Sequence, residues 1–119
     1  NSIAVGNILI PSGAWTFDPV TGRHDPNLPF PDQVWRTLIN LKDVLEEAGS
    51  SLEHLVKTWT YIIEPDNRSI VREVELEFYK KYATSLIDEP PASTTVLNYG
   101  LAAIGRVEID SIAVVPNRL

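Results

Sequence analysis

Two helical patterns, each set between stretches of β-branched and aromatic residues, constrain the fold of this chain more than any other feature. The first opens at Pro31 and Asp32 and ends at Gly49, because proline and aspartate favour the first turn of a helix and glycine favours its end. The second follows residues 67–69. Each pattern has an apolar face at helical spacing. These faces consist of Val34, Leu38, Leu41, Leu45 and Ala48 in the first helix and Val71, Val74, Phe78 and Tyr82 in the second.

Strands are predicted on either side of these helices. Residues 55–63 are rich in Val, Thr, Trp, Tyr and Ile, and residues 94–97 and 107–115 carry further strand signals. Near the start, Gly6 and Asn7 split two short apolar runs, which indicates a hairpin or a bulged strand. Between them and the first helix, residues 16–32 hold four prolines and one glycine, which predicts a long irregular loop.

The predicted order of elements, β, α, β, α, β, β, is typical of an α+β fold. With 119 residues the chain has the length of one domain, so residues 1–119 are expected to form a single unit. Two helices on one face of a mixed sheet would make a two-layer sandwich. Because no third layer is predicted, the other face of the sheet needs cover, and self-association is the simplest way to supply it.

Composition excludes several classes of function. The chain has no cysteine and only two histidines, so neither a thiolate nucleophile nor a zinc site of the usual kind is expected, and no cofactor motif is present. The net charge of −6 argues against nucleic acid and anionic membranes as partners. No apolar run is long enough to span a membrane. No signal segment is recognisable, which favours a cytoplasmic protein, although the chain begins at Asn1 and the native start is expected to be missing.

A series of short landmarks runs along the chain. The landmarks are Gly6-Asn7, Ser12-Gly13, residues 18–22, Gln33, Asn40-Leu41, Ala48-Gly49, residues 56–58, Tyr79, Pro91-Ala92 and residues 107–113. Each landmark alone is weak, but in their order and spacing they resemble the RidA/YjgF family of reactive-intermediate deaminases. The resemblance covers nearly the whole chain as one RidA-like domain. It implies a chorismate-mutase-like fold, a homotrimer and ligand clefts between neighbouring subunits.

The resemblance also assigns roles to residues. It implies that Glu108 orients or activates water and that Ser12 and Gly13 help to form the pocket. The family's substrate-binding arginine falls on Ser93 in this chain, since the interval from Pro91 to Glu108 needs no gap. The full set of predicted substrate-binding residues is Ser12, Gly13, Ala14, Trp15, Ser93, Thr95 and Arg106, with Glu108 catalytic and no metal ligand.

This chain departs from the family pattern at the positions that would bind a carboxylate. Serine at position 93 offers one neutral hydrogen bond where arginine would offer a bidentate, charge-assisted pair. Leu76 stands where deaminases often carry asparagine, Ala14 where the family often has glutamine, and the family's N-terminal Gly-Pro-Tyr segment is absent from this chain. We therefore expect 2-iminocarboxylates to bind poorly.

Three hypotheses for the function follow. The first is a divergent RidA-like enzyme that acts at clefts between subunits, with Glu108 as acid or base on an imine, an enamine or a related substrate. The reaction would be hydrolysis, isomerisation, dehydration or cyclisation. The second is a ligand-binding or regulatory trimer without catalysis, and the third, least favoured, is an ordinary 2-iminocarboxylate deaminase. A solvated stripe of charge on the sheet would also explain Glu108, and an ion pair with Glu108 or Asp110 would explain Arg106.

Overall fold

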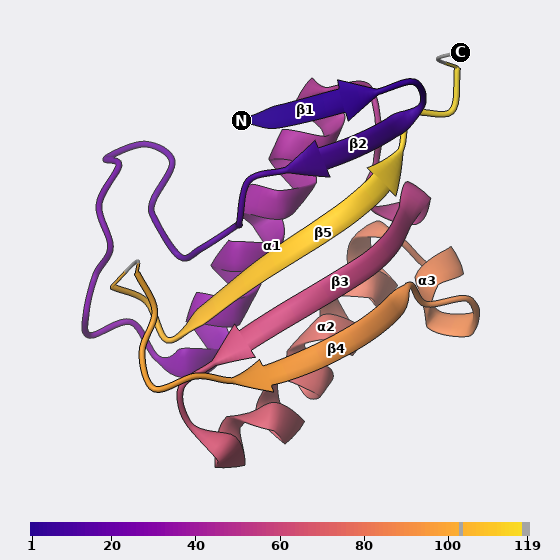
Figure 1. The fold of residues 1–119 in the computed structure, drawn as a ribbon. Helices are drawn as coiled ribbons and strands as arrows, with labels where there is room; N and C mark the ends of the chain where they lie inside the picture. The colour runs from indigo at the N-terminus through magenta and orange to yellow at the C-terminus, as the bar shows by residue number, and fades with distance from the viewer. Residues whose placement is uncertain (103, 118–119) are drawn as a thin grey trace.

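The chain folds into one mixed sheet backed by helices, as Figure 1 shows for the computed structural model. The structure describes residues 1–102 and 104–117. The strands are β1 (Ser2–Val5), β2 (Ile8–Pro11), β3 (Leu55–Ile62), β4 (Ala92–Leu97) and β5 (Val107–Val114). The helices are α1 (Phe30–Glu47), α2 (Arg68–Tyr82) and the short α3 (Ser85–Asp88), with 3-10 turns at Leu52–His54 and Pro65–Asn67. The five strands lie in the order β1-β2-β5-β3-β4.

Only one neighbouring pair of strands in this sheet is parallel. Strand β4 runs parallel to β3, and α2 provides the crossover between them. Strand β5 pairs antiparallel with β2 on one side and with β3 on the other. The α+β fold with a mixed sheet and two main helices on one face is therefore confirmed (Figure 1).

The predicted helices and strands are confirmed within one or two residues at most ends. Residues 3–10 form a hairpin rather than one bulged strand, and its turn uses Gly6 at φ 60°, a left-handed conformation that favours glycine. Helix α3 was not predicted, because four residues are too few to show helical periodicity.

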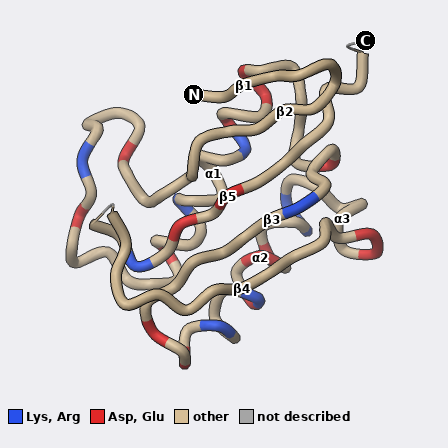
Figure 2. The backbone as a smooth tube through the Cα atoms, viewed as in Figure 1, with Lys and Arg blue, Asp and Glu red and all other residues tan. Residues whose placement is uncertain are grey.

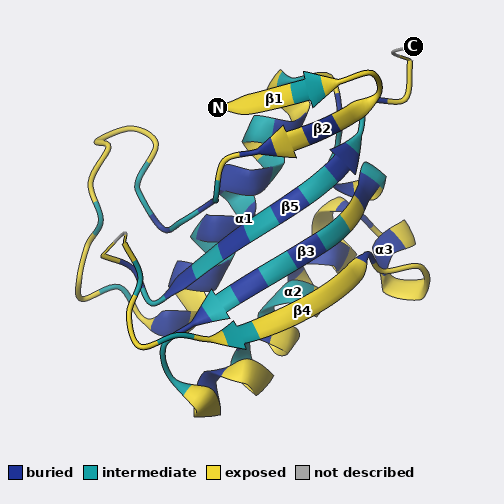
Figure 3. Ribbon diagram, in the orientation of Figure 1, coloured by how far each residue is buried: buried dark blue, intermediate teal, exposed yellow. Residues whose placement is uncertain are grey.

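The face of the sheet toward the helices holds the core. Along β5 the burial alternates at every residue, with Val107 and Ile109 buried and Glu108 and Asp110 half-buried, as the predicted period of two requires (Figure 3). Opposite them, α1 buries Val34, Leu38, Leu41 and Leu45. Trp35 of α1 packs edge-on against Phe78 of α2, with ring centroids 4.9 Å apart, which joins the two helices.

The opposite face of the sheet, here called the open face, carries apolar side chains that the described residues 1–102 and 104–117 leave exposed. The exposed fractions on the β1–β2 hairpin are 69% for Ile3, 66% for Val5, 39% for Ile8 and 47% for Ile10. Trp59 is only half-buried and lies on this face, with the Lys57 ammonium 5.2 Å from its ring centroid. Trp59 therefore lies outside the core, because its neighbours Thr58 and Thr60 take the buried positions of β3.

Asn40 ties the loop before α1 to the helix. Its buried amide donates two hydrogen bonds, to the backbone oxygen of Trp15 at 2.8 Å and to that of Phe17 at 2.9 Å. A buried amide with two acceptors fixes the backbone that it binds. This fixes the course of the chain directly after Ser12 and Gly13.

We predict that Asn40→Ala destabilises the fold by about 1–3 kcal/mol, because two part-buried carbonyl groups lose their donor. Urea denaturation measures the change, and amide hydrogen exchange of Trp15 and Phe17 should accelerate. The exposed Asn117 provides the control, since Asn117→Ala should stay within about 0.5 kcal/mol of the original chain. Equal stability of the two variants would contradict the role given to Asn40.

Candidate functional site

Glu108 lies on the open face directly against the segment that follows β2. The backbone N–H and C=O of Ala14 pair with Ile109 at 2.8 and 2.9 Å, which holds this segment antiparallel to β5. As a result Gly13 approaches Glu108 so closely that a Cβ on Gly13 would lie 2.7 Å from Glu108 Oε2. A side chain at position 13 would therefore move the Glu108 carboxyl from this position, which places the predicted site residues Gly13 and Glu108 side by side.

The surroundings of Glu108 favour its protonated form. Burial raises the pKa of the Glu108 carboxyl, and the negative charge of Asp110 on the same face raises it further. The Tyr61 hydroxyl donates to Asp110 Oδ2 at 3.4 Å. A half-buried carboxyl group with a raised pKa is a candidate to give and take protons.

Arg106 has a different partner from either one expected for it. Its guanidinium binds Glu64 through two hydrogen bonds, Nε to Oε1 at 2.5 Å and Nη2 to Oε2 at 2.8 Å, and lies 5.1 Å from the Phe30 ring centroid. This pair lowers the pKa of the Glu64 carboxyl. The side chain is thus engaged in joining the start of β5 to the residues after β3, and neither Glu108 nor Asp110 is its ion-pair partner.

The remaining residues predicted on the segment after β2 lie near Glu108 in different settings. Ser12 is exposed, Ala14 is buried by its pairing with β5, and Trp15 is half-buried. The rings of Trp15 and Phe17 lie 5.3 Å apart. Gly13 is thus the residue of this segment that approaches Glu108, and Ser12 and Ala14 adjoin it along the chain.

Ser93 and Thr95 lie apart from that group, on the edge strand β4. Ser93 is opposite Thr58 in the parallel register, and Thr58 points toward the helices. Ser93 therefore faces the helix side of the sheet, whereas Glu108 faces the open side. Within one chain the predicted site is divided into two parts.

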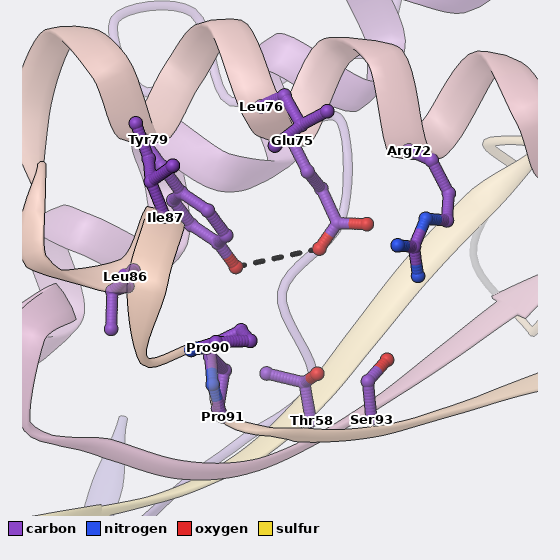
Figure 4. A pocket seen from close by; sticks show the side chains of 10 residues that line it. All are labelled: Thr58, Arg72, Glu75, Leu76, Tyr79, Leu86, Ile87, Pro90, Pro91 and Ser93. Atoms are coloured by element: carbon purple, nitrogen blue, oxygen red, sulfur yellow. Dashed lines mark hydrogen bonds between the residues drawn. The ribbon is translucent and has the colours of Figure 1, made fainter.

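A pocket of about 170 Å³ adjoins Ser93 between α2, α3 and the strands β3 and β4 (Figure 4). It is lined by Thr58, Arg72, Glu75, Leu76, Tyr79, Leu86, Ile87, Pro90, Pro91 and Ser93. Sequence reasoning named only Ser93 as a site residue here and missed the charged pair Arg72 and Glu75. The signal that could have found them is their spacing, since Arg72, Glu75, Leu76 and Tyr79 share one face of α2 at i, i+3, i+4 and i+7.

The described residues 1–102 and 104–117 contain no cluster of three or more His, Asp or Glu side chains able to hold a metal ion. Within the same residues, none of the helices has the length and apolar character needed to cross a membrane.

Comparison with known proteins identifies the family. The family model described as endoribonuclease L-PSP matches residues 1–115. A RutC family protein of Pyrococcus horikoshii is 30% identical over 112 residues, which cover 94% of this chain and 82% of that protein. A RutC family protein of Pyrococcus abyssi is matched over 61% of its length, so the chain spans less than two thirds of that relative.

Solved structures agree with this match. A putative endoribonuclease from Thermotoga maritima superposes with a TM-score of 0.83 at 31% identity, covering 95% of this chain and 83% of that one. RidA from an Antarctic Psychrobacter superposes with a TM-score of 0.82 at 29% identity, covering 95% and 85%. The chain belongs to the endoribonuclease L-PSP family, which is the family of the RidA and YjgF proteins, so the resemblance seen in the sequence is confirmed.

We predict that the Glu108 carboxyl titrates above the ordinary glutamate range and that Asp110→Asn lowers its pKa. The sign follows from the charge, because removing a neighbouring anion makes the ionised form of Glu108 less costly. Carbon-detected NMR of the side-chain carboxyl measures both values. Asp43→Asn, on α1 and away from this face, is the control. An unchanged pKa of Glu108 in Asp110→Asn would refute the coupling.

Proposed function

We propose that this protein is a small-molecule enzyme of the RidA type, with its sites in clefts between the subunits of a homotrimer and with Glu108 as the acid or base. The substrate is an imine, an enamine or a related compound, and the reaction is hydrolysis, isomerisation, dehydration or ring closure. The observation that carries this proposal is the position of Glu108, half-buried against Gly13 with its pKa raised.

Assembly of subunits is supported by the open face. Ile3, Val5, Ile8 and Ile10 are exposed on one continuous side of the β1–β2 hairpin. Burying that side against another copy removes apolar surface from water. Assembly would also give the two parts of the divided site a way to meet, with Glu108 supplied by one subunit and Ser93 by its neighbour.

A small molecule suits this protein better than RNA, although the family model and one similar structure are described as endoribonucleases. The net charge is −6. Figure 2 shows the Lys and Arg positions scattered over the loops, helices and β3 among acidic ones. RNA binding draws most of its affinity from a basic surface that neutralises phosphates, and such a surface is not what this charge distribution provides.

A catalytically inactive binding trimer is the main alternative, and Ser93 is the observation that favours it. A hydroxyl group at position 93 cannot hold a substrate carboxylate as a guanidinium would. Ordinary deamination of 2-iminocarboxylates is the least favoured function for the same reason. The two main alternatives differ in what Glu108 does, so Glu108 is the residue to test.

We predict that Glu108→Gln lowers turnover by about 10²- to 10⁴-fold while ligand binding persists, because glutamine keeps the shape and hydrogen bonding of the side chain and loses its proton chemistry. A thermal-shift screen of apolar imines, enamines and cyclic ketones supplies the ligand, and NMR follows its conversion. Glu53→Gln, at an exposed position, is the matched control and should convert at the original rate.

The Glu108→Gln variant also distinguishes the enzyme from the binding trimer and from a Glu108 that is only a solvated charge. Ligands that bind to both the original protein and Glu108→Gln, but that neither of them converts, would indicate the binding trimer. Unchanged conversion by Glu108→Gln would remove Glu108 from the mechanism. A change of less than about 0.5 kcal/mol in both stability and binding would be the result for a merely solvated charge.

We predict that light scattering gives a mass near three times 13.3 kDa. Ile10→Lys should shift the protein toward monomers, because a charge would then lie within the apolar surface that assembly buries. Val20→Lys, in the loop before α1, is the control for adding the same charge at an exposed apolar residue. A monomer at micromolar concentration would contradict the cleft between subunits.

A further inference from the structure

One positively charged and one negatively charged side chain line the pocket beside Ser93, with space between their end groups. Arg72 and Glu75 both extend from α2 toward the strands, and Figure 4 shows their end groups above Ser93 and Thr58. No salt bridge joins the two in the part of the chain that the structure describes, 1–102 and 104–117. A small polar group placed between them could therefore contact both.

Glu75 is held in position by its neighbour on the same helix. The Tyr79 hydroxyl donates to Glu75 Oε2 at 3.4 Å (Figure 4). Burial raises the pKa of the Glu75 carboxyl, while the positive charge of Arg72 acts in the opposite direction. From β3, β4 and α3 the pocket is lined by residues without titratable groups, so Arg72 and Tyr79 are the charged and titratable neighbours that line it with Glu75.

The floor of the pocket has a hydroxyl group that lacks a partner. Thr58 is 3% exposed, and its Oγ1 makes no hydrogen bond among the described residues. Leaving a buried hydroxyl unsatisfied costs on the order of the desolvation of one polar group. Thr58 lies in the pocket lining next to Ser93, so a polar floor faces the charged groups of α2.

The other side of the pocket is apolar. Leu86 and Ile87 of α3 and the prolines Pro90 and Pro91 form this wall. The volume of about 170 Å³ suits a molecule of only a few heavy atoms, since a dry cavity of about 150 Å³ accepts benzene. The ligand must therefore be small, with one polar end and one short apolar end.

We propose that this pocket binds a small neutral molecule with an amide-type head group and a short apolar tail. The N–H of the head donates to Glu75, and its carbonyl oxygen accepts from Arg72 and from the hydroxyl group of Ser93. The tail lies against Leu86 and Ile87. A ligand anion would face the carboxylate of Glu75, and a ligand cation would face Arg72, so a neutral head that pairs with both is selected.

This inference names the ligand class for the half of the proposed site that contains Ser93, and it rests on the proposed function only for the role of that ligand as substrate. The pocket lies within one chain, and its residues do not include Glu108. Failure of catalysis by Glu108 would leave ligand binding here intact, and failure of binding here would leave the titration of Glu108 unchanged. The two proposals therefore fail separately.

The test compares three probes with the same four-carbon skeleton and different charge: butyramide, butyrate and butylammonium. Titration of the isotope-labelled protein at neutral pH, followed by amide NMR, gives the affinity and the position of each probe. We expect butyramide to bind most tightly and to shift resonances of α2, α3 and the first residues of β4. Butyrate and butylammonium should bind about tenfold more weakly or worse, because each meets one like charge.

Two variants then change the preference in opposite directions. Glu75→Gln should raise the affinity for butyrate by about tenfold, because the facing carboxylate is gone and Arg72 remains. Arg72→Met should raise the affinity for butylammonium instead. Glu73→Gln and Arg68→Met change the same charges at exposed positions of α2 outside the pocket and should leave all three affinities unchanged. The amide spectrum and melting temperature of each variant establish that it is folded.

The outcomes decide the proposal. Tighter binding of butyrate than of butyramide by the unaltered protein would overturn it, as would shifts confined to residues outside the pocket or no shift with any probe at millimolar concentration. A preference that Glu75→Gln and Arg72→Met leave unchanged would also overturn it. A reversal of preference by the two pocket variants, absent from the two controls, would establish that Arg72 and Glu75 select the ligand by its charge.

Discussion

The antiparallel pairing of β5 with both β2 and β3 is the constraint on which the rest of the structure depends. Because β5 lies in the middle of the sheet, its alternate side chains must serve two surfaces. Val107 and Ile109 contribute to the core beneath α1, while Glu108 and Asp110 are held on the open face. A shift of one residue in this register would bury the carboxylates and expose the core residues, so the same hydrogen bonds that stabilise the sheet fix the position of the site.

The pairing of Ala14 with Ile109 extends this control beyond the sheet. It brings Gly13 against the Glu108 carboxyl, so that a side chain at position 13 would have to move Oε2 from its place. Asn40 holds the next residues of the loop from the side of α1. Glu108 is therefore confined by backbone from a segment nearly a hundred positions away in the sequence, and a confined, half-buried carboxyl with an acidic neighbour has its pKa raised.

The parallel pair β3–β4 organises the second region of interest. Its crossover helix α2 lies over the strands, and the face of α2 toward them carries Arg72, Glu75 and Tyr79 above Thr58 and Ser93 (Figure 4). Position 93, to which the resemblance assigns an arginine, is serine in this chain, and charged groups lie on the helix opposite. We regard the pocket as a surface with its own selectivity rather than as a weakened version of a carboxylate site.

The sequence by itself determined the elements of this protein. Helical spacing from Val34 to Leu45 and the alternation from Val107 to Asp110 depend on local geometry, so both could be read without a structure. The order and spacing of the short landmarks could also be read from the sequence alone, and they indicated the family.

Tertiary structure decided which residues those elements bring together. Three features could not be deduced from the sequence alone. They are the pairing of Arg106 with Glu64, the position of Trp59 on the open face, and the grouping of Arg72 and Glu75 with Ser93. Each depends on the register and packing of segments distant in sequence, and a local pattern carries no record of which distant residue will face it.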